Sequence, residues 1–183
     1  MYTVTKVMHF CYWHRLLHYA GKCRYLHGHN GRAEIELSAK ALDRLGMVED
    51  FTKIKRAIQG WIDETLDHKM ILCQDDPALA ALRKLGEPLF VMTENPTAER
   101  LAQLLFEETR RMGFPVASVT LWETESSYAV YALGRTVTAR PRRDRGRSPS
   151  RPALRGHPDG GRFAGRARRR GASRRVRSIS TAA

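Results

Sequence analysis

The sequence predicts an α+β domain in which helices cover one face of an antiparallel sheet. Two observations support this fold class. Strand-like segments stand at the start and at the end of the first 135 residues with helical patterns between them, and the strands alternate polar and apolar residues. A continuous parallel sheet would need strands and helices to alternate more regularly.

Two strands are expected at the start of the chain. Residues 2–13 mix β-branched and aromatic residues with partial alternation, and residues 32–39 (RAEIELSA) alternate more cleanly. Both strands should therefore present one face to a core and the other to water.

Two amphipathic helices are expected next. The first lies between Asp50 and Leu66, where apolar residues recur at helical spacing. Its apolar positions are Phe51, Ile54, Ile58, Trp61, Ile62 and Leu66. The second follows the segment NPT, where Asn95 or Thr97 can cap it and Pro96 suits its first turn, and it ends at Gly113. Its apolar stripe consists of Leu101, Leu104, Leu105 and Met112.

The domain is expected to close with a pair of strands at residues 116–124 and 127–133, joined tightly through Glu125 and Ser126. A short additional strand is expected at residues 88–93.

Charge divides the chain at about residue 135. Residues 1–135 contain 17 Lys and Arg against 17 Asp and Glu, whereas the other 48 residues hold 15 Arg, no Lys and 2 acidic residues. The formal charge of +13 therefore belongs to the tail. Because the domain itself is electrically balanced, this charge does not indicate that the domain binds nucleic acid. We expect a folded domain over residues 1–135 and a disordered Arg-rich tail over residues 136–183.

The tail has two interpretations. It could be an electrostatic arm for nucleic acid or another anionic surface, since clustered Arg gains affinity by releasing counterions. Alternatively it is a passenger, because the change from mixed Lys and Arg to Arg alone resembles read-through or a frame change. The composition favours the passenger.

Composition also predicts the compartment. No apolar run approaches the ~20 residues that cross a bilayer, and the start MYTVTKVM lacks the apolar stretch of a secretory signal. The three cysteines, Cys11, Cys23 and Cys73, form no paired pattern. We expect a cytoplasmic protein with reduced thiols and no membrane partner.

A metal site is suggested by the segment GKCRYLHGHN at residues 21–30. His27 and His29 are two residues apart, so they point to the same side of an extended chain, and Gly28 between them lets the backbone approach a bound group closely. His14, from a nearby strand end, would complete a three-histidine site with an open fourth position, as in catalytic zinc centres. Histidines at this spacing also occur on ordinary polar surfaces.

Cys23 precedes His27 by four residues and is a candidate general base. Lys22 and Arg24 beside it would favour its thiolate form. The alternatives are that Cys23 is a fourth metal ligand or an ordinary buried thiol.

Three carboxyl and imidazole groups complete the candidates. Asp67 and His68, directly after the first helix, form a proton-transfer pair if they touch in space. Glu123, in the segment WET, could anchor the guanidine-like edge of a pterin or a guanine, although exposed strand carboxylates are commoner.

Taken together, six segments in order resemble the 6-pyruvoyltetrahydropterin synthase superfamily. They are His14, the C-x-x-x-H-G-H of residues 23–29, GMVEDF at 46–51, LDH at 66–68, NPTAE at 95–99 and WET at 122–124. The three-residue gap between Cys23 and His27 resembles the bacterial branch, the 6-carboxy-5,6,7,8-tetrahydropterin synthases. The resemblance covers about residues 2–134 and none of the tail.

The resemblance implies a tunnelling fold (T-fold), a four-stranded antiparallel sheet with two helices on one face. Its subunits join edge to edge into a homo-oligomer, which removes open sheet edges. Sites of the family lie at subunit interfaces, so Cys23 and the pair Asp67 and His68 that face one substrate would come from different chains.

The resemblance also implies roles for individual residues. The zinc ligands would be His14, His27 and His29, the catalytic groups Cys23, Asp67 and His68, the pterin anchor Glu123, and the residues shaping the substrate pocket Thr97 and Glu99. The implied reaction converts 7,8-dihydroneopterin triphosphate to 6-carboxy-5,6,7,8-tetrahydropterin, with loss of triphosphate and acetaldehyde, on the way to queuosine and other deazapurines.

One segment departs from the family pattern. Cys11, Tyr12 and Trp13 precede His14 where the family usually has small residues, which would reshape the mouth of the zinc site. The departure bears on substrate detail and not on the metal. Three alternatives stay open: a 6-pyruvoyl product, a pterin-binding module without turnover, and, from another class, a nucleic-acid-binding protein that acts through the tail.

Overall fold

The computed structural model describes residues 1–132. The predicted domain boundary at residue 135 and the expected disorder of residues 136–183 lie outside the described residues. No helix within residues 1–132 is long and apolar enough to span a membrane.

The described residues contain a six-stranded sheet with the strand order β4-β3-β1-β2-β5-β6. The strands are β1 (Tyr2–His14), β2 (His27–Ala39), β3 (Lys69–Cys73), β4 (Leu89–Met92), β5 (Val116–Trp122) and β6 (Tyr128–Ala132). The four antiparallel strands β1, β2, β5 and β6 are the ones expected, and the short strand expected at residues 88–93 is β4.

The expectation of a purely antiparallel sheet of four strands is wrong. β3 pairs in parallel with the last three residues of β1, and β4 pairs in parallel with β3. β3 has the sequence KMILC, a short apolar run whose periodicity does not distinguish a strand from a buried turn of helix. The sheet is therefore mixed, with a parallel extension beside the end of β1.

The first predicted helix is one continuous helical segment with a π-helical turn inside it. It consists of α1 (Phe51–Ile54), η2 (Lys55–Gln59) and α2 (Gly60–Thr65), and Asp50 caps its start by accepting from the Thr52 N–H. Ile54, Ile58, Ile62 and Leu66 are buried, as the spacing predicts. Phe51, in contrast, is 48% exposed.

The second predicted helix is α4 (Ala98–Arg111). Thr97 is its N-cap, so Pro96 precedes the cap and is not in the first turn. Gly113 follows the helix with a φ of +87°, a conformation that glycine adopts without strain, and this confirms the predicted end. A further helix, α3 (Ala78–Leu85), and the 3₁₀ turn η1 (Lys22–Arg24) were not expected.

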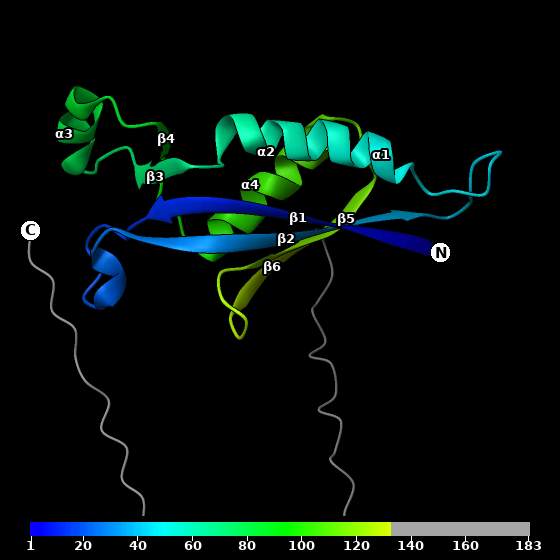
Figure 1. The fold of residues 1–183 in the computed structure, drawn as a ribbon. Coiled ribbons are helices and arrows are strands. Elements are labelled where there is room, and N and C mark those ends of the chain that lie inside the picture. The colour runs from blue at the N-terminus through cyan, green and yellow to red at the C-terminus, as the bar shows by residue number, and fades with distance from the viewer. Residues whose placement is uncertain (133–183) are drawn as a thin grey trace, which may run out of the picture. The chain divides into compact units, whose positions relative to one another are not determined.

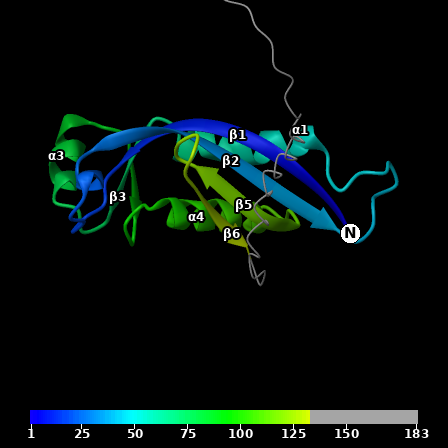
Figure 2. The same cartoon turned by 90° about the horizontal axis from the view of Figure 1, so that it is seen from below.

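The helices α1, α2 and α4 cover one face of the sheet (Figure 1), and the other face is open when the domain is turned (Figure 2). The core forms between them. On the sheet it is lined by Met8, Phe10 and Tyr12 of β1, Ala33, Ile35 and Leu37 of β2, and Val119 and Leu121 of β5. Because these residues alternate with more exposed ones, the prediction of a sheet with a single buried face is confirmed for these strands.

β1 and β2 pair over their whole length, from Tyr2 opposite Ala39 to His14 opposite His27. β2 therefore begins five residues before the predicted start of the second strand. The two histidines of the HGH segment lie on a paired strand and not in a loop, and this fixes the face on which they stand.

Candidate metal centre and active site

Three histidines continue the buried row of the β1–β2 pair beyond the core. His14 lies opposite His27, and His29 lies opposite Tyr12, so all three side chains stand on the face that carries the core. One nitrogen of each ring can be chosen so that the three atoms lie within 4.8 Å of one another. The ring centroids are 4.5 to 5.1 Å apart. The structure thus brings together the three residues predicted as metal ligands.

Each of the three rings uses Nδ1 for a hydrogen bond to a backbone carbonyl oxygen. The acceptors for His14, His27 and His29 are the carbonyls of Pro96 (2.7 Å), Tyr25 (2.7 Å) and Glu123 (3.2 Å). A carbonyl only accepts, so Nδ1 carries the proton in each neutral ring and Nε2 keeps its lone pair. Such a contact is the usual outer support of a metal-binding histidine.

His14 offers a direct test of whether the residues fit a metal ion. It is 3% exposed, and its Nε2 is one of two buried side-chain nitrogen or oxygen atoms within residues 1–132 that have no hydrogen-bond partner. Burial lowers the pKa of His14, although the bond to Pro96 and the Glu123 carboxylate oppose this. A neutral imidazole with a buried, unpartnered nitrogen is the form that binds a metal, so the residues fit such an ion.

A carboxylate and a phenol adjoin the three histidines. Glu123 Oε1 lies 3.7 Å from His14 Nε2 and 4.0 Å from His29 Nε2. Tyr12 donates its hydroxyl to the same oxygen at 3.0 Å. Burial and the carboxylate raise the pKa of Tyr12, so the phenol stays protonated and remains a donor. The sequence marks Tyr12 only as a departure from the family pattern, because a contact across 111 residues leaves no local signal.

Gly28 does not serve the purpose predicted for it. It stands on the outer face of β2, and a Cβ atom there would lie 2.8 Å from Cδ1 of Trp13. The missing side chain therefore makes room for Trp13 and not for a group bound to the histidines.

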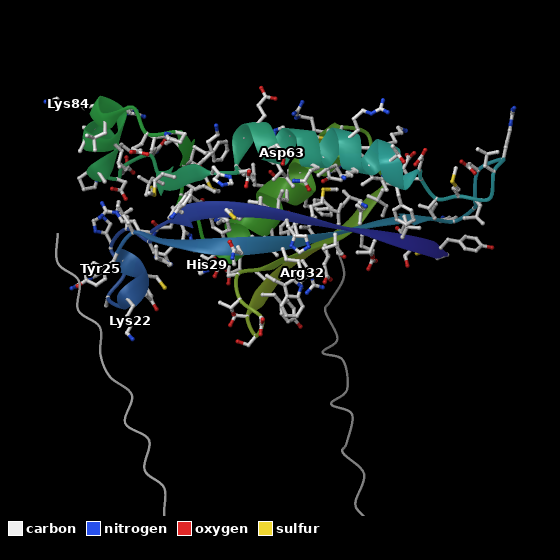
Figure 3. All side chains as sticks on the ribbon, in the orientation of Figure 1. Lys22, Tyr25, His29, Arg32, Asp63 and Lys84 are labelled. Carbon is white, nitrogen blue, oxygen red and sulfur yellow. The ribbon has the colours of Figure 1, made fainter. Side chains whose placement is uncertain are left out.

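Cys23 lies in the connection between β1 and β2. Figure 3 labels Lys22 and Tyr25 of this connection, which follows the end of the strand pair that carries His29. Cys23 is half-buried in η1, and its carbonyl accepts from the Leu16 N–H at 2.8 Å. Asn95 bonds both the N–H and the carbonyl of Leu17 through its side chain, at 2.7 and 2.9 Å. The segment NPT thus fixes both the connection and, through Pro96, the ring of His14.

A buried ion pair anchors the end of β1 beside the centre. Arg15 bonds both carboxylate oxygens of Asp76, with Nε to Oδ2 at 2.7 Å, and Asp76 is 3% exposed. Burial alone would raise the pKa of Asp76, but the bonds from Arg15 and from the Ala78 N–H outweigh it and lower the pKa. Because Arg15 directly follows His14, this ion pair restrains the chain next to the His14 ring.

Asp67 and His68 form the predicted contact. His68 Nδ1 lies 2.7 Å from Asp67 Oδ2, and the other carboxylate oxygen accepts from the Cys11 N–H at 2.7 Å. Partial burial alone would raise the pKa of Asp67, but the bonds from Cys11 and His68 prevail and lower it. His68 has a φ of +55°, held by its N–H bond to the Cys11 carbonyl. Strain of this kind in a non-glycine residue is common at functional sites.

This pair stands apart from the three histidines. His68 is largely exposed and contacts the ring of Trp13, which lies on the face of β1 opposite to His14. Within residues 1–132, no hydrogen bond, ion pair or ring contact joins Asp67 or His68 to Cys23 or to the three histidines. One chain therefore holds two separate groups of candidate residues.

The two remaining candidates lie at the start of α4. Thr97 caps the helix by accepting from the Arg100 N–H, and Glu99 is exposed in the first turn. A role of Thr97 and Glu99 in shaping a substrate pocket stays a prediction.

The sheet and the three-imidazole centre at the end of its two central strands define a candidate metalloenzyme built on an antiparallel strand pair. Residues 3–133 match the family described as 6-pyruvoyl tetrahydropterin synthase, and the chain belongs to this family. The match excludes the Arg-rich tail, so it lends no support to a nucleic-acid-binding function.

Individual relatives support the same assignment. The 6-carboxy-5,6,7,8-tetrahydropterin synthase of Rickettsia conorii is 37% identical over 135 residues, which cover 70% of this chain and 98% of the relative. The enzyme of the same name from Aquifex aeolicus is 35% identical over 60% of this chain and 75% of its own. The solved structure of Caenorhabditis elegans 6-pyruvoyl tetrahydropterin synthase has a TM-score of 0.55 at 27% identity, covering 72% of this chain and 94% of its own. The prediction of an enzyme of this family is thereby confirmed.

Proposed function

We propose that the protein is a zinc-dependent 6-carboxy-5,6,7,8-tetrahydropterin synthase. The observation that carries the proposal is the set of three imidazoles whose Nδ1 atoms all bond backbone carbonyls, which leaves three Nε2 atoms for one metal ion. The names of the curated relatives supply the reaction. The substrate would be 7,8-dihydroneopterin triphosphate, and the other products acetaldehyde and triphosphate.

Zinc is the proposed ion because a ligand set of three neutral histidines with an open position is typical of catalytic zinc. His14, His27 and His29 would hold it. When bound, it would act as a Lewis acid toward the hydroxyl groups of the substrate side chain.

The protein groups would bind the substrate and move protons. Glu123 would accept hydrogen bonds from the guanidine-like edge of the pterin, with Thr97 and Glu99 shaping the pocket. Cys23 would remove a proton from the side chain, and His68 would carry protons, oriented by Asp67 through the 2.7 Å contact at Nδ1. That contact leaves Nε2 of His68 as the nitrogen that exchanges the proton.

The complete site would need more than one chain. Cys23 lies on the connection between β1 and β2, whereas Asp67 and His68 lie beside the outer face of β1. Edge-to-edge pairing of subunits, which the family resemblance implies, would bring the outer pair of one chain to the Cys23 of another. We therefore propose a homo-oligomer with shared sites, in the cytoplasm.

The test is to incubate the zinc-loaded protein with 7,8-dihydroneopterin triphosphate and to follow acetaldehyde and the pterin by mass spectrometry. Acetaldehyde and 6-carboxy-5,6,7,8-tetrahydropterin in equal amounts support the proposal. A 6-pyruvoyl product without acetaldehyde would assign the sister activity, which the likeness to the Caenorhabditis elegans enzyme also suggests. No turnover by an intact, metal-loaded oligomer would contradict both and leave binding alone.

A further inference from the structure

Tyr12 lies at the boundary between the apolar core and the three-histidine centre. On the inner face of β1 it follows Met8 and Phe10, and its ring centroid is 5.3 Å from that of His14 and 5.7 Å from that of His29. Tyr12 is 1% exposed, so its hydroxyl group needs a hydrogen-bond acceptor inside the protein.

The acceptor is a carboxylate that faces the histidines. The Tyr12 hydroxyl donates to Glu123 Oε1, the oxygen that lies within 4.0 Å of Nε2 of both His14 and His29. The Glu123 side chain is 22% exposed. Without the bond from Tyr12, this carboxylate could turn toward water, because its charge is better solvated there.

The ring of Tyr12 is itself held in place on two sides. Phe10 stacks on it at a centroid distance of 5.4 Å. A Cβ atom on Gly31 would lie 3.0 Å from Cε1 of Tyr12, so the glycine provides the space that the ring occupies. A ring fixed in this way directs its hydroxyl at one point and loses little entropy in making the bond.

We infer that Tyr12 is a positioning residue whose hydroxyl holds the Glu123 carboxylate beside the three histidines. The held carboxylate raises the affinity of the histidines for a divalent cation. It also offers the substrate a hydrogen-bond acceptor in a fixed position. The second consequence rests on the proposed function, whereas the first does not.

The first consequence follows from Coulomb attraction. A carboxylate oxygen held within 4 Å of two metal-binding nitrogens lies close to any cation bound there, and a mobile carboxylate in water interacts much less. Loss of such an outer partner typically weakens metal binding by about 10- to 100-fold. Glu123 is partly exposed, so we expect the lower end of that range for Tyr12.

Cobalt(II) binding to the full-length, metal-free protein tests this consequence without turnover. Tyr12→Phe keeps the ring and its packing and should weaken cobalt(II) binding about tenfold. Glu123→Ala should weaken it at least as much, and Tyr12→Phe should add nothing in the Glu123→Ala background, because Tyr12 acts only through Glu123. Tyr131→Phe is the matched control, since Tyr131 is a half-buried tyrosine that packs on Phe106, and it should leave the affinity unchanged.

Two results would overturn the inference. One is an unchanged or raised cobalt(II) affinity in Tyr12→Phe. The other is that Tyr12→Phe weakens cobalt(II) binding as much in the Glu123→Ala background as it does in the original protein. Should Tyr12→Phe fail to fold, an unchanged cobalt(II) affinity in Glu123→Ala overturns the inference by itself.

A second measurement separates this inference from the proposed function. Binding of 7,8-dihydroneopterin is followed by fluorescence in a Cys23→Ala background, where turnover is strongly reduced, and Tyr12→Phe should weaken this binding about tenfold. If the unmodified protein binds cobalt(II) but neither binds nor converts the pterin, the proposed function fails. The cobalt(II) measurements then still decide the role of Tyr12.

Discussion

The two faces of β1 near its end differ in how they hold chemically active groups. On the inner face, His14 is buried, its ring is fixed by a carbonyl and its Nε2 lacks a partner. On the outer face, the ring of His68 is 69% exposed, and a positive φ and a carboxylate fix its position. The inner group brings together, within one chain, three histidines that could hold a metal ion. Within residues 1–132, the outer group contacts none of the other candidate residues, and under the proposed function it would act together with a second chain.

The largest effect should come from breaking the inner group. His29→Ala removes one of three ligands and should lower both bound zinc and turnover, the latter by at least about a thousandfold, since metal polarisation contributes several kcal/mol to such reactions. Metal analysis and the acetaldehyde assay measure this. His9→Ala, at an exposed histidine of the neighbouring strand β1, is the control. Full zinc content in His29→Ala would refute the assigned ligand set.

The next effect should separate proton transfer from metal binding. Cys23→Ala should reduce turnover by about a hundredfold to ten-thousandfold, the range of general base catalysis, with zinc content unchanged. Cys11→Ala should be near neutral, because Cys11 holds Asp67 through its backbone N–H. A fall in zinc content in Cys23→Ala would instead make Cys23 a metal ligand.

A mixing experiment tests whether the two faces cooperate between chains. Cys23→Ala and His68→Ala should each retain at most about 1% of the normal activity. Oligomers reassembled from equal amounts of both should regain about a quarter of it, because random assembly of a two-chain site pairs an intact Cys23 with an intact His68 that often. Oligomers reassembled from either variant alone are the control. No recovery in mixed oligomers of normal size would place Cys23 and His68 of one chain in the same site.

The smallest effect concerns stability around the centre. Asp76→Asn leaves Arg15 without its anion and should lower the free energy of unfolding by about 1–3 kcal/mol, measured by urea denaturation at pH 7. Asp75→Asn, an exposed neighbour, should have little effect. An equal loss in both variants would show that the ion pair contributes nothing specific.

The same pair predicts a dependence of stability on pH. Asp76 has a lowered pKa in the folded protein, so its contribution is present above the unfolded pKa of about 3.9 and is lost as the pH falls through the folded value. The difference in stability between the original protein and Asp76→Asn should therefore narrow below about pH 4. A difference that stays constant to low pH would contradict the assignment.

The sequence was most informative where chemistry or periodicity is local. The spacing of His27 and His29 on an extended chain, the adjacency of Asp67 and His68 and the stripe of Ile54, Ile58 and Ile62 all depend on neighbours within a few residues. It was least informative at short elements. β3 was missed because a run of five residues carries no readable period, and α3 because its eight residues make only about two turns. Phe51 was assigned to a buried stripe that begins only at Ile54.

By itself, the sequence determined an α+β domain of the 6-pyruvoyl tetrahydropterin synthase family, with three histidines that could hold a metal ion and the contacting pair Asp67 and His68. The tertiary structure decided which of these groups meet. Tyr12 and Glu123 are 111 residues apart, and the register of β1 with β2 and of β2 with β5 brings them to one hydrogen bond. The parallel pairing of β1 with β3, together with the bond from the His68 N–H to the Cys11 carbonyl, places His68 on the other face of β1. Contacts across a sheet depend on strand order and pairing, which no local pattern encodes.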